Sequence, residues 1–583
     1  MVDNTTNSLS SGGQNDTSGF NEGAWGWLFC LVCLIVLLSN LGAGALFEPD
    51  EGRNAEKARE ILLLNDWVTP YQNFLPTLDK PIGYYWLVAL SFKLFGLSEW
   101  SARLPSVLAA LGCIFLVYRF ARLQWGLREA LWSCLVLLTS IEFFVLSRLV
   151  IFDMALTFFI TLALFLFYRA AWGGGDGRSQ KFYGLAMYVA MGAGSLVKGP
   201  VALVVPGMVI FCYLFFTRRW FLLRRMNPFL GALLYFAVVA PWYLWVETRN
   251  PGYLQYFLWE EHFVRYLTPH FGRTKSWYYF FVVLAVGFLP WSLLIPFTVR
   301  NLWKRTFDDT NLFLLLWVLL PFAFFSASHS KLPHYILPIY PALALLTGRS
   351  LALEFNDTPG RQWWVLYLPW ILTIGSIVYL LVGAAWPQLL PNQIRAAVTQ
   401  KVTWIGLYGT AICFVFAVFI AGNLRQIWKD QGAAYVCTTI GLALFWVVVG
   451  QVMTGASFHR ASKSLAARIA PLIGAEDRLV FYDTYVEGIP FYLRTDTPIW
   501  LVHARKKGEV MGSYYVAEKH PNPAPGCGQV IFTFEEFVEQ WKKNERPLKV
   551  LVKEKNFLRL STQLGVSPKL LTKLDEYLLV TNR

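Results

Sequence analysis

The sequence predicts a polytopic α-helical membrane protein with about thirteen transmembrane helices, plus a small soluble α/β C-terminal domain. Three observations predict it: the composition, a long series of apolar segments and a polar C-terminal region. Of the 583 residues, 56% are hydrophobic and 15% are charged, whereas a soluble domain carries roughly 25% charged residues. Long apolar runs need a bilayer as their solvent. The composition therefore excludes a disordered chain, a coiled coil and an ordinary soluble enzyme.

The chain begins with a polar stretch. Residues 1–23 are rich in Ser, Gly, Asn and Asp, which predicts a disordered cytoplasmic tail. This stretch lacks the basic region and the small-residue cleavage site of a signal peptide. The first apolar run, Ala24–Phe47, is therefore expected to be a retained transmembrane span.

Residues 24–454 form the predicted transmembrane domain, in which apolar segments follow one another. Their approximate bounds are 24–47, 82–97, 102–121, 129–147, 149–172, 183–197, 200–216, 228–246, 278–299, 311–328, 334–353, 364–385, 403–422 and 433–454. Segment 82–97 is shorter than the about 20 residues that a span needs. We expect it to be a juxtamembrane or re-entrant helix, which leaves thirteen spans.

Basic residues orient these spans. The net charge is +14, and many of the basic residues lie in short connections between apolar segments. These connections contain Arg119, Arg122 and Arg128; Arg178 and Lys181; Arg218, Arg219, Arg224 and Arg225; Arg300, Lys304 and Arg305; Arg349 and Arg361; and Arg425 and Lys429. Cytoplasmic loops of membrane proteins collect Lys and Arg. The other face, with loops 48–99 and 250–277 and the C-terminal region, is then external. The positive charge does not indicate a nucleic-acid partner.

Residues 455–583 are more polar and form the predicted external domain. Strand-like runs alternate with helical patterns such as Glu535–Lys543. The strand-like runs are Arg478–Tyr482, Pro498–Val502, Gln529–Phe534 and Leu548–Val552. This alternation is typical of a small α/β domain.

The predicted topology brings the unusual polar residues to the external face. They are Asp50, Glu51, Arg53, Asp79, Lys80, Arg148, Asp153, Lys198, Glu261, His262, Arg265, Lys331, His334 and Tyr340. Ionisable groups at membrane depth cost several kcal/mol unless they are paired or solvated. Their gathering on one side therefore indicates a single water-filled cavity.

Two carboxylates among several cations suit a reaction in which a lipid-linked phosphate leaves. Cations hold the phosphate and stabilise the charge that develops on its oxygens. A carboxylate positions or deprotonates an acceptor, or stabilises an oxocarbenium-like centre. Tyr340 is a neutral donor suited to the same phosphate.

The same residues also have purely structural interpretations. They are a juxtamembrane charge cluster of Asp50, Glu51 and Arg53, an interface lysine at position 80, an Arg148–Asp153 ion pair, and interfacial polar roles for His262 and His334. Glu261 and His262 are candidate ligands for a divalent metal, but two residues do not make a metal site.

Several motifs carry a family resemblance. In order they read FEPDEGRNAEKAREIL, LDKPIGYYWLVALSFKLFG, ARLPSVLAAL, SRLVIFDMAL, SLVKGPVALVVPG and SHSKLPHYILPIYPALALLTG. The chain resembles, over most of residues 24–583, the ArnT branch of membrane glycosyltransferases with the GT-C fold. These are 4-amino-4-deoxy-L-arabinose lipid A transferases, related to protein O-mannosyltransferases.

The resemblance implies an undecaprenyl-phosphate-linked aminoarabinose donor, a lipid A phosphate acceptor and inverting transfer at the periplasmic face of the bacterial inner membrane. It implies resistance to polymyxin and cationic peptides. By its motifs, Asp50 and Asp153 would be the active-site acids, and Lys80, Arg265 and Tyr340 would hold the donor phosphate. We expect a monomer that contacts membrane lipids and binds no nucleic acid.

The acceptor phosphate is already ionised near neutral pH, so it needs little help from a base. We therefore expect Asp50 and Asp153 to orient the aminosugar and to stabilise positive charge on it. Two other functions remain open. One is a glycosyltransferase with another polyprenyl-phosphate sugar or a protein hydroxyl acceptor. The other is a transporter of lipid-linked sugars, which the absence of repeated halves in the sequence disfavours.

Overall fold

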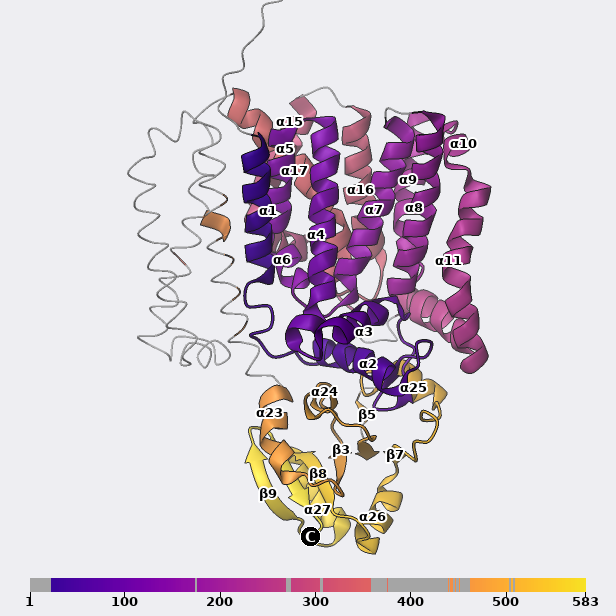
Figure 1. The fold of residues 1–583 in the computed structure, drawn as a ribbon, viewed down its shortest axis with the longest axis vertical. Coiled ribbons are helices and arrows are strands. Elements are labelled where there is room, and N and C mark those ends of the chain that lie inside the picture. Colours follow the sequence, from indigo (N-terminus) through magenta and orange to yellow (C-terminus); the bar gives the residue numbers. More distant parts are fainter. Residues whose placement is uncertain are drawn as a thin grey trace, which may run out of the picture.

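A helix bundle stands above a smaller α/β domain in the computed structural model (Figure 1). The structure describes residues 22–173, 176–268, 274–304, 308–357, 462–502, 505–506 and 509–583, and a few single positions between 375 and 454. The predicted tail up to residue 21 and nearly all of the last three predicted spans lie outside the described residues.

Most helices of the bundle run roughly parallel to one another (Figure 1). The bundle helices are α1 (Glu22–Leu38), α4 (Glu99–Gln124), α5 (Leu127–Leu138), α6 (Ile141–Ser147), α7 (Phe152–Trp172), α8 (Gly177–Lys198), α9 (Val201–Thr217), α10 (Leu222–Met226), α11 (Pro228–Arg249), α14 (Tyr279–Gly287), α15 (Ile295–Lys304), α16 (Asp309–Ala327) and α17 (Tyr340–Asp357). Among the described residues, five helical stretches are long and apolar enough to cross a membrane, or seven if each of two bent pairs is one span. The chain is thus a multi-pass membrane protein, and the number thirteen stays a prediction.

Two predicted spans are bent rather than continuous. Helices α5 and α6 meet at 69°, and α14 meets the segment Trp291–Lys304 at 106°. At the first bend the hydroxyls of Thr139 and Ser140 donate to carbonyls of the preceding helical turn, a bond that competes with regular helix geometry. At the second bend Pro290 supplies no backbone donor. Hydropathy alone does not reveal such breaks.

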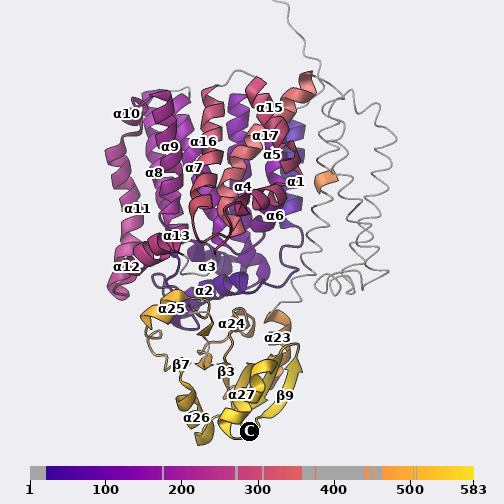
Figure 2. The ribbon, with the colours of Figure 1, turned by 180° about the vertical axis from the view of Figure 1, so that it is seen from behind.

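One end of the bundle is covered by short elements. Helices α2 (Asp50–Leu64) and α3 (Gly83–Phe95) lie across this end, between the bundle and the C-terminal domain (Figure 1). Helix α3 corresponds to the predicted non-spanning segment 82–97 and is not among the candidate spans. The other short elements are β1 (Tyr71–Gln72), β2 (Leu75–Pro76), α12 (Tyr253–Gln255), the π-helix η1 (Tyr256–Val264), α13 (Arg265–Leu267), and the 3-10 helices η2 (Trp291–Leu294) and η3 (Pro333–Ile339). Figure 2 shows α12 and α13 at this same end.

Two arginines hold the chain between α1 and α2. Arg148 donates to the carbonyls of Val36, Leu37 and Ser39. Arg103 donates to the carbonyls of Leu41, Gly44 and Ala45 over 2.8–2.9 Å. Arg103 also binds both carboxylate oxygens of Glu51, with its Nη2 2.8 Å from Oε2. Glu51 and Arg148 are therefore structural groups in this fold.

The C-terminal domain is a six-stranded mixed sheet with helices on both faces. The strand order is β7-β4-β3-β8-β10-β9, with parallel pairs from β7 to β8 and antiparallel pairs at β10. The strands are β3 (Arg478–Tyr482), β4 (Trp500–Val502), β7 (Ile531–Phe532), β8 (Leu548–Lys553), β9 (Lys569–Leu574) and β10 (Tyr577–Thr581), with a separate ribbon of β5 (Arg505–Lys506) and β6 (Glu509–Val510). The helical elements are α23 (Ser462–Ile469), η5 (Ala470–Leu472), α24 (Ile489–Leu493), α25 (Tyr514–Lys519), α26 (Phe534–Lys543) and α27 (Glu554–Leu564).

The strands fall where the sequence predicted them. Strand β3 has the predicted bounds, and β4, β7 and β8 overlap the other three predicted runs. Helix α26 covers the predicted helical pattern Glu535–Lys543, and a capping box between Thr533 and Glu536 begins it. Buried apolar residues lie on both faces of the sheet, as expected for parallel strands.

Candidate active site

A cavity of about 1210 Å³ lies where the end of the bundle meets the C-terminal domain. Helices α2 and α3, the first turn of α7, η1 and η3 contribute to its wall, and so do α23, the loop after β3, the start of α27 and the turn between β9 and β10. The predicted site residues that line it are Asp50, Arg53, Asp79, Lys80, Asp153, Lys198, Glu261, Arg265 and His334. The structure thus brings together residues that are far apart in the sequence.

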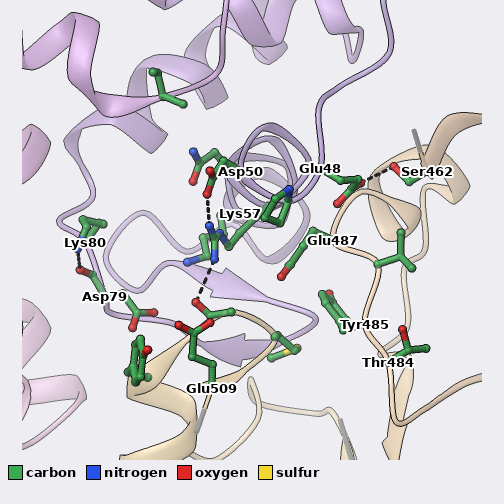
Figure 3. Close-up of a pocket in the computed structure, with 18 of the residues that line it drawn as sticks. Glu48, Asp50, Lys57, Asp79, Lys80, Ser462, Thr484, Tyr485, Glu487 and Glu509 are labelled. Carbon is green, nitrogen blue, oxygen red and sulfur yellow. Dashed lines mark hydrogen bonds and ion pairs between the residues drawn. The ribbon is translucent and has the colours of Figure 1, made fainter. Parts of the chain in front are cut away.

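Helix α2 places one charged face along the cavity. Asp50, Arg53 and Lys57 follow one another at helical spacing and all line the wall. The guanidinium of Arg53 pairs with Asp50 and donates to the carbonyl of Gly512 over 3.0 Å. Figure 3 shows Asp50 in the cavity, with its ion pair drawn as a dashed line. The Asp50 side chain is 61% exposed, so its carboxylate is open to a ligand.

Glu261 binds two cations at once. Nζ of Lys80 and Nη1 of Arg265 each lie 2.7 Å from the same atom, Oε2 of Glu261. Burial alone would raise the pKa of Glu261, but Lys80 and Arg265 hold it at about 2. Arg265 also donates to the hydroxyl of Tyr335 over 3.4 Å. The pair Lys80 and Arg265, both predicted to hold the donor phosphate, therefore converges on one point of the wall.

Asp153 forms a second charged group with Lys198 and His334. Asp153 lies in the first turn of α7 and Lys198 in the last turn of α8, which suit the helix dipoles. Lys198 donates to Oδ1 of Asp153, and Nε2 of His334 lies 3.6 Å from Oδ2. The alternative of an Arg148–Asp153 ion pair is wrong, because Arg148 binds backbone carbonyls instead.

Two other predicted site residues lie away from the cavity wall. Tyr340 is fully buried, and its hydroxyl donates to Glu142 inside the bundle. The tyrosine that contacts Arg265 is Tyr335, five residues earlier in the same motif. Lys331 donates to the carbonyl of Lys275 over 3.3 Å. The structure thus separates Tyr340 from the Lys80–Arg265 pair, a correction to the predicted grouping.

The two candidate metal ligands, Glu261 and His262, have protein partners in this structure. Oε2 of Glu261 is occupied by two cations. Nδ1 of His262 lies 2.6 Å from the carbonyl of Phe257, which requires a proton on that nitrogen. Burial lowers the pKa of His262 to about 4. Within the ranges that the structure describes, no three His, Cys, Asp or Glu side chains gather as a metal site.

The sequence interpretation missed two acidic groups where the bundle meets the C-terminal domain. Oε1 of Glu48 accepts hydrogen bonds from the Ser462 hydroxyl at 2.6 Å and the Gly488 amide at 2.8 Å. Glu487 accepts from Gln72. Burial raises the pKa of Glu48 to about 7 and that of Glu487 to about 8. Glu48 stands beside Asp50 in the sequence, whereas only the docked domain reveals Glu487.

Asp79 connects the two parts of the protein. Its Oδ2 accepts from the Ser513 hydroxyl, and its Oδ1 lies 3.2 Å from the Tyr515 amide. The loop that presents Lys80 is therefore fastened to the C-terminal domain. The cavity as a whole offers buried cations for phosphate oxygens and carboxylates for positive charge.

Comparison with known proteins identifies relatives of this chain. Residues 79–245 match the family described as dolichyl-phosphate-mannose-protein mannosyltransferase. An undecaprenyl phosphate-α-4-amino-4-deoxy-L-arabinose arabinosyl transferase of Aeromonas hydrophila is 34% identical over 83% of this chain and 92% of its own length. A relative of the same name from Pseudomonas paraeruginosa is 35% identical over 61% of this chain, and the match spans 63% of that relative.

A solved structure is also similar. The crystal structure of ArnT from Cupriavidus metallidurans bound to undecaprenyl phosphate has a TM-score of 0.80 and 27% identity. The match covers 96% of this chain and 98% of the solved one. The membrane part therefore has the GT-C fold that the sequence motifs implied.

Proposed function

Since this chain belongs to the undecaprenyl phosphate-α-4-amino-4-deoxy-L-arabinose arabinosyl transferase family, we propose that it transfers this aminosugar to lipid A. The donor is aminoarabinose linked to undecaprenyl phosphate, and the acceptor is a phosphate group of lipid A. The observation that carries the proposal is the convergence of Lys80 and Arg265 on one buried point of a large cavity.

The donor phosphate binds at Lys80 and Arg265. A phosphate oxygen takes the place of Oε2 of Glu261, which both cations now contact. An Arg guanidinium offers two parallel donors to phosphate, and a Lys ammonium adds a point charge. As the bond to the sugar breaks, negative charge grows on the leaving phosphate, and these cations stabilise it.

The acceptor attacks from the opposite side of the sugar. An oxygen of the lipid A phosphate forms a bond to the anomeric carbon while the bond to the donor phosphate oxygen breaks. Undecaprenyl phosphate leaves with that electron pair, and the anomeric configuration inverts. Asp50 and Asp153 stabilise the positive charge that develops on the sugar, as carboxylates do for oxocarbenium-like centres.

The location follows from the charge distribution. Helix α10, which carries Arg224 and Arg225, lies at the opposite end of the bundle from the C-terminal domain (Figure 1). Basic connections are cytoplasmic. The cavity and the C-terminal domain then face the periplasm, and the bundle spans the bacterial inner membrane as a monomer. The added amine reduces the negative charge of lipid A and so gives resistance to polymyxin.

Mass spectrometry of lipid A tests the proposal. Lipid A from cells that express the chain should gain the mass of one aminopentose per modified phosphate, and lipid A from cells without it should not. Purified protein offered a peptide acceptor and a polyprenyl-phosphate sugar should give no glycopeptide. Unmodified lipid A under expressing conditions would overturn the proposal, and a glycopeptide product would favour a protein O-mannosyltransferase-like activity.

A further inference from the structure

Lys57 is a buried cation that bonds to no anion within the described part of the chain. Its side chain lines the cavity, yet the residue is only 2% exposed. Among the residues that the structure describes, its ammonium has no hydrogen bond or ion pair. The ammonium lies over the aromatic ring of Tyr85, with its Nζ 5.6 Å from the ring centroid. Burying an ammonium without a paired anion costs free energy, so its presence in the wall calls for a ligand.

The other buried cations of the wall already have carboxylates. Lys80 and Arg265 share Glu261, and Lys198 pairs with Asp153. Arg53, one helical turn before Lys57, pairs with Asp50. A ligand phosphate must displace or share those carboxylates. At Lys57 an arriving anion meets a charge that no carboxylate of the described residues occupies.

Burial and the neighbouring charges set the pKa of Lys57. Asp79 and Glu487 favour its protonated form, while Arg53 and Lys80 oppose it, and burial lowers its pKa to about 8. The ammonium therefore stays largely protonated at neutral pH. An anion that arrives beside it gains a buried, charge-assisted hydrogen bond.

Its position favours one of the two phosphates of the reaction. Figure 3 shows Lys57 between Asp50 and Glu487, with Lys80 on the other side of Asp50. The donor phosphate has its own two cations in Lys80 and Arg265. The incoming phosphate is also an anion. Two phosphates brought together repel each other, and a further cation beside the incoming phosphate offsets this repulsion.

We propose that Lys57 binds an oxygen of the acceptor phosphate and is a substrate-binding residue for lipid A. This inference rests on the proposed function. It assigns Lys80 and Arg265 to the phosphate that leaves and Lys57 to the phosphate that arrives. The aromatic ring of Tyr85 supports the ammonium from the side and supplies no competing anion.

Steady-state kinetics of the purified full-length protein test the proposal. The acceptor is varied at saturating donor, and the donor is varied at saturating acceptor, for the wild type and for Lys57→Met, Lys57→Arg and Lys543→Met. The KM for lipid A should rise at least about tenfold in Lys57→Met. The KM for the donor should stay within about twofold. Lys57→Arg should recover most of the acceptor affinity, and the exposed control Lys543→Met should resemble the wild type.

Thermal unfolding separates binding from a structural role. Met replaces the buried charge with an apolar chain of similar length, so the Tm of Lys57→Met should equal or exceed that of the wild type. An unchanged acceptor KM, a rise in the donor KM alone, or a parallel loss of Tm and activity would each overturn the assignment. A wild type that gives no glycosylated lipid A would instead overturn the proposed function.

Discussion

Lys80 and Arg265 donate to one and the same atom, Oε2 of Glu261, each over 2.7 Å. The two cations come from different parts of the chain, and the carboxylate between them is almost wholly shielded from solvent. A phosphate oxygen has the same charge and the same hydrogen-bonding needs as this carboxylate oxygen. Glu261 therefore both assembles the phosphate site and competes with the ligand for it.

Replacing Glu261 should reveal this competition. In Glu261→Gln the two cations lose their internal anion, so undecaprenyl phosphate should bind more tightly, by about tenfold. Isothermal titration of the purified protein with undecaprenyl phosphate measures it. The neighbouring Glu260→Gln, which has no place in the cavity wall, is the matched control. Weaker binding in Glu261→Gln would show that Glu261 only organises the site.

The two active-site carboxylates should each be required for transfer. Asp50→Asn and Asp153→Asn keep the shape of the side chain but remove its charge. If these groups stabilise positive charge on the sugar, kcat should fall by about 10² or more in each, with little change in the KM for the donor. The glycosylated lipid A formed by purified variants of normal Tm gives the measurement. Full activity in both variants would contradict the proposed role.

Two tyrosines of one motif should behave differently. Tyr335 contacts Arg265, whereas Tyr340 donates to Glu142 inside the bundle. Tyr335→Phe should weaken donor binding without a large loss of stability. Tyr340→Phe should leave donor binding unchanged and lower the Tm, because it leaves a buried carboxyl oxygen without its donor, at a cost of about 1–3 kcal/mol. Weaker donor binding in Tyr340→Phe, with unchanged binding in Tyr335→Phe, would show that Tyr340 contacts the donor phosphate.

The buried Glu51–Arg103 pair should control folding rather than chemistry. Both side chains are at most 5% exposed, and two oxygens of Glu51 meet the guanidinium. Removing one partner of such a pair costs about 3–5 kcal/mol. Arg103→Met should therefore lower the Tm and the yield of folded protein strongly. The folded fraction should retain its affinity for undecaprenyl phosphate, which a binding assay on detergent-solubilised protein measures.

Stability should fall as the pH rises through neutrality. Burial raises the pKa of Glu48 to about 7 and that of Glu487 to about 8, from an ordinary value of 4.5. The folded protein then holds protons that the unfolded chain has released, so the stabilisation is full below pH 4.5 and is lost up to about pH 8. Arg53, Glu48 and Lys57 are the charged groups that act on Glu487, and Gln72 donates to it.

Thermal unfolding between pH 6 and pH 8.5 measures this effect. The Tm of the wild type should drop by roughly 2 °C or more. Glu487→Gln should show a shallower dependence, because one of the two titrating carboxyls is absent. A wild-type Tm that rises over this range, or equal slopes for the two proteins, would show that these groups do not govern the interface.

The sequence predicted the local features of the fold well. The strand-like run Arg478–Tyr482 and the helical pattern Glu535–Lys543 predicted β3 and α26, because each is a property of a few neighbouring residues. The short segment 82–97 was predicted not to span, and α3 lies across the end of the bundle (Figure 1). The charged motifs also identified most of the cation-bearing wall of the cavity.

Features that depend on tertiary contacts escaped prediction. The partner of Asp153 is Lys198 and not the nearby Arg148, because helix packing and not sequence distance decides it. Tyr335 and Tyr340 are equally plausible in the sequence, and only the geometry separates them. Glu487 enters the cavity through docking of the C-terminal domain, which leaves no local signal.

The way the segment after α1 is held decides which substitutions it tolerates. Arg103 and Arg148 recognise backbone carbonyls between residues 36 and 45 and no side chain of that stretch. Every amino acid presents the same carbonyl, so substitutions there leave the contact groups intact as long as the chain keeps its path. Two positions are restricted by the backbone: a Cβ atom at Gly42 would lie 2.9 Å from Cβ of Trp100, and Asn40 has a φ of 54°. Variation at the exposed Ala43 and the half-buried Ser39 is thus compatible with unchanged activity, whereas the buried Leu37 and Leu41 and the two arginines are constrained.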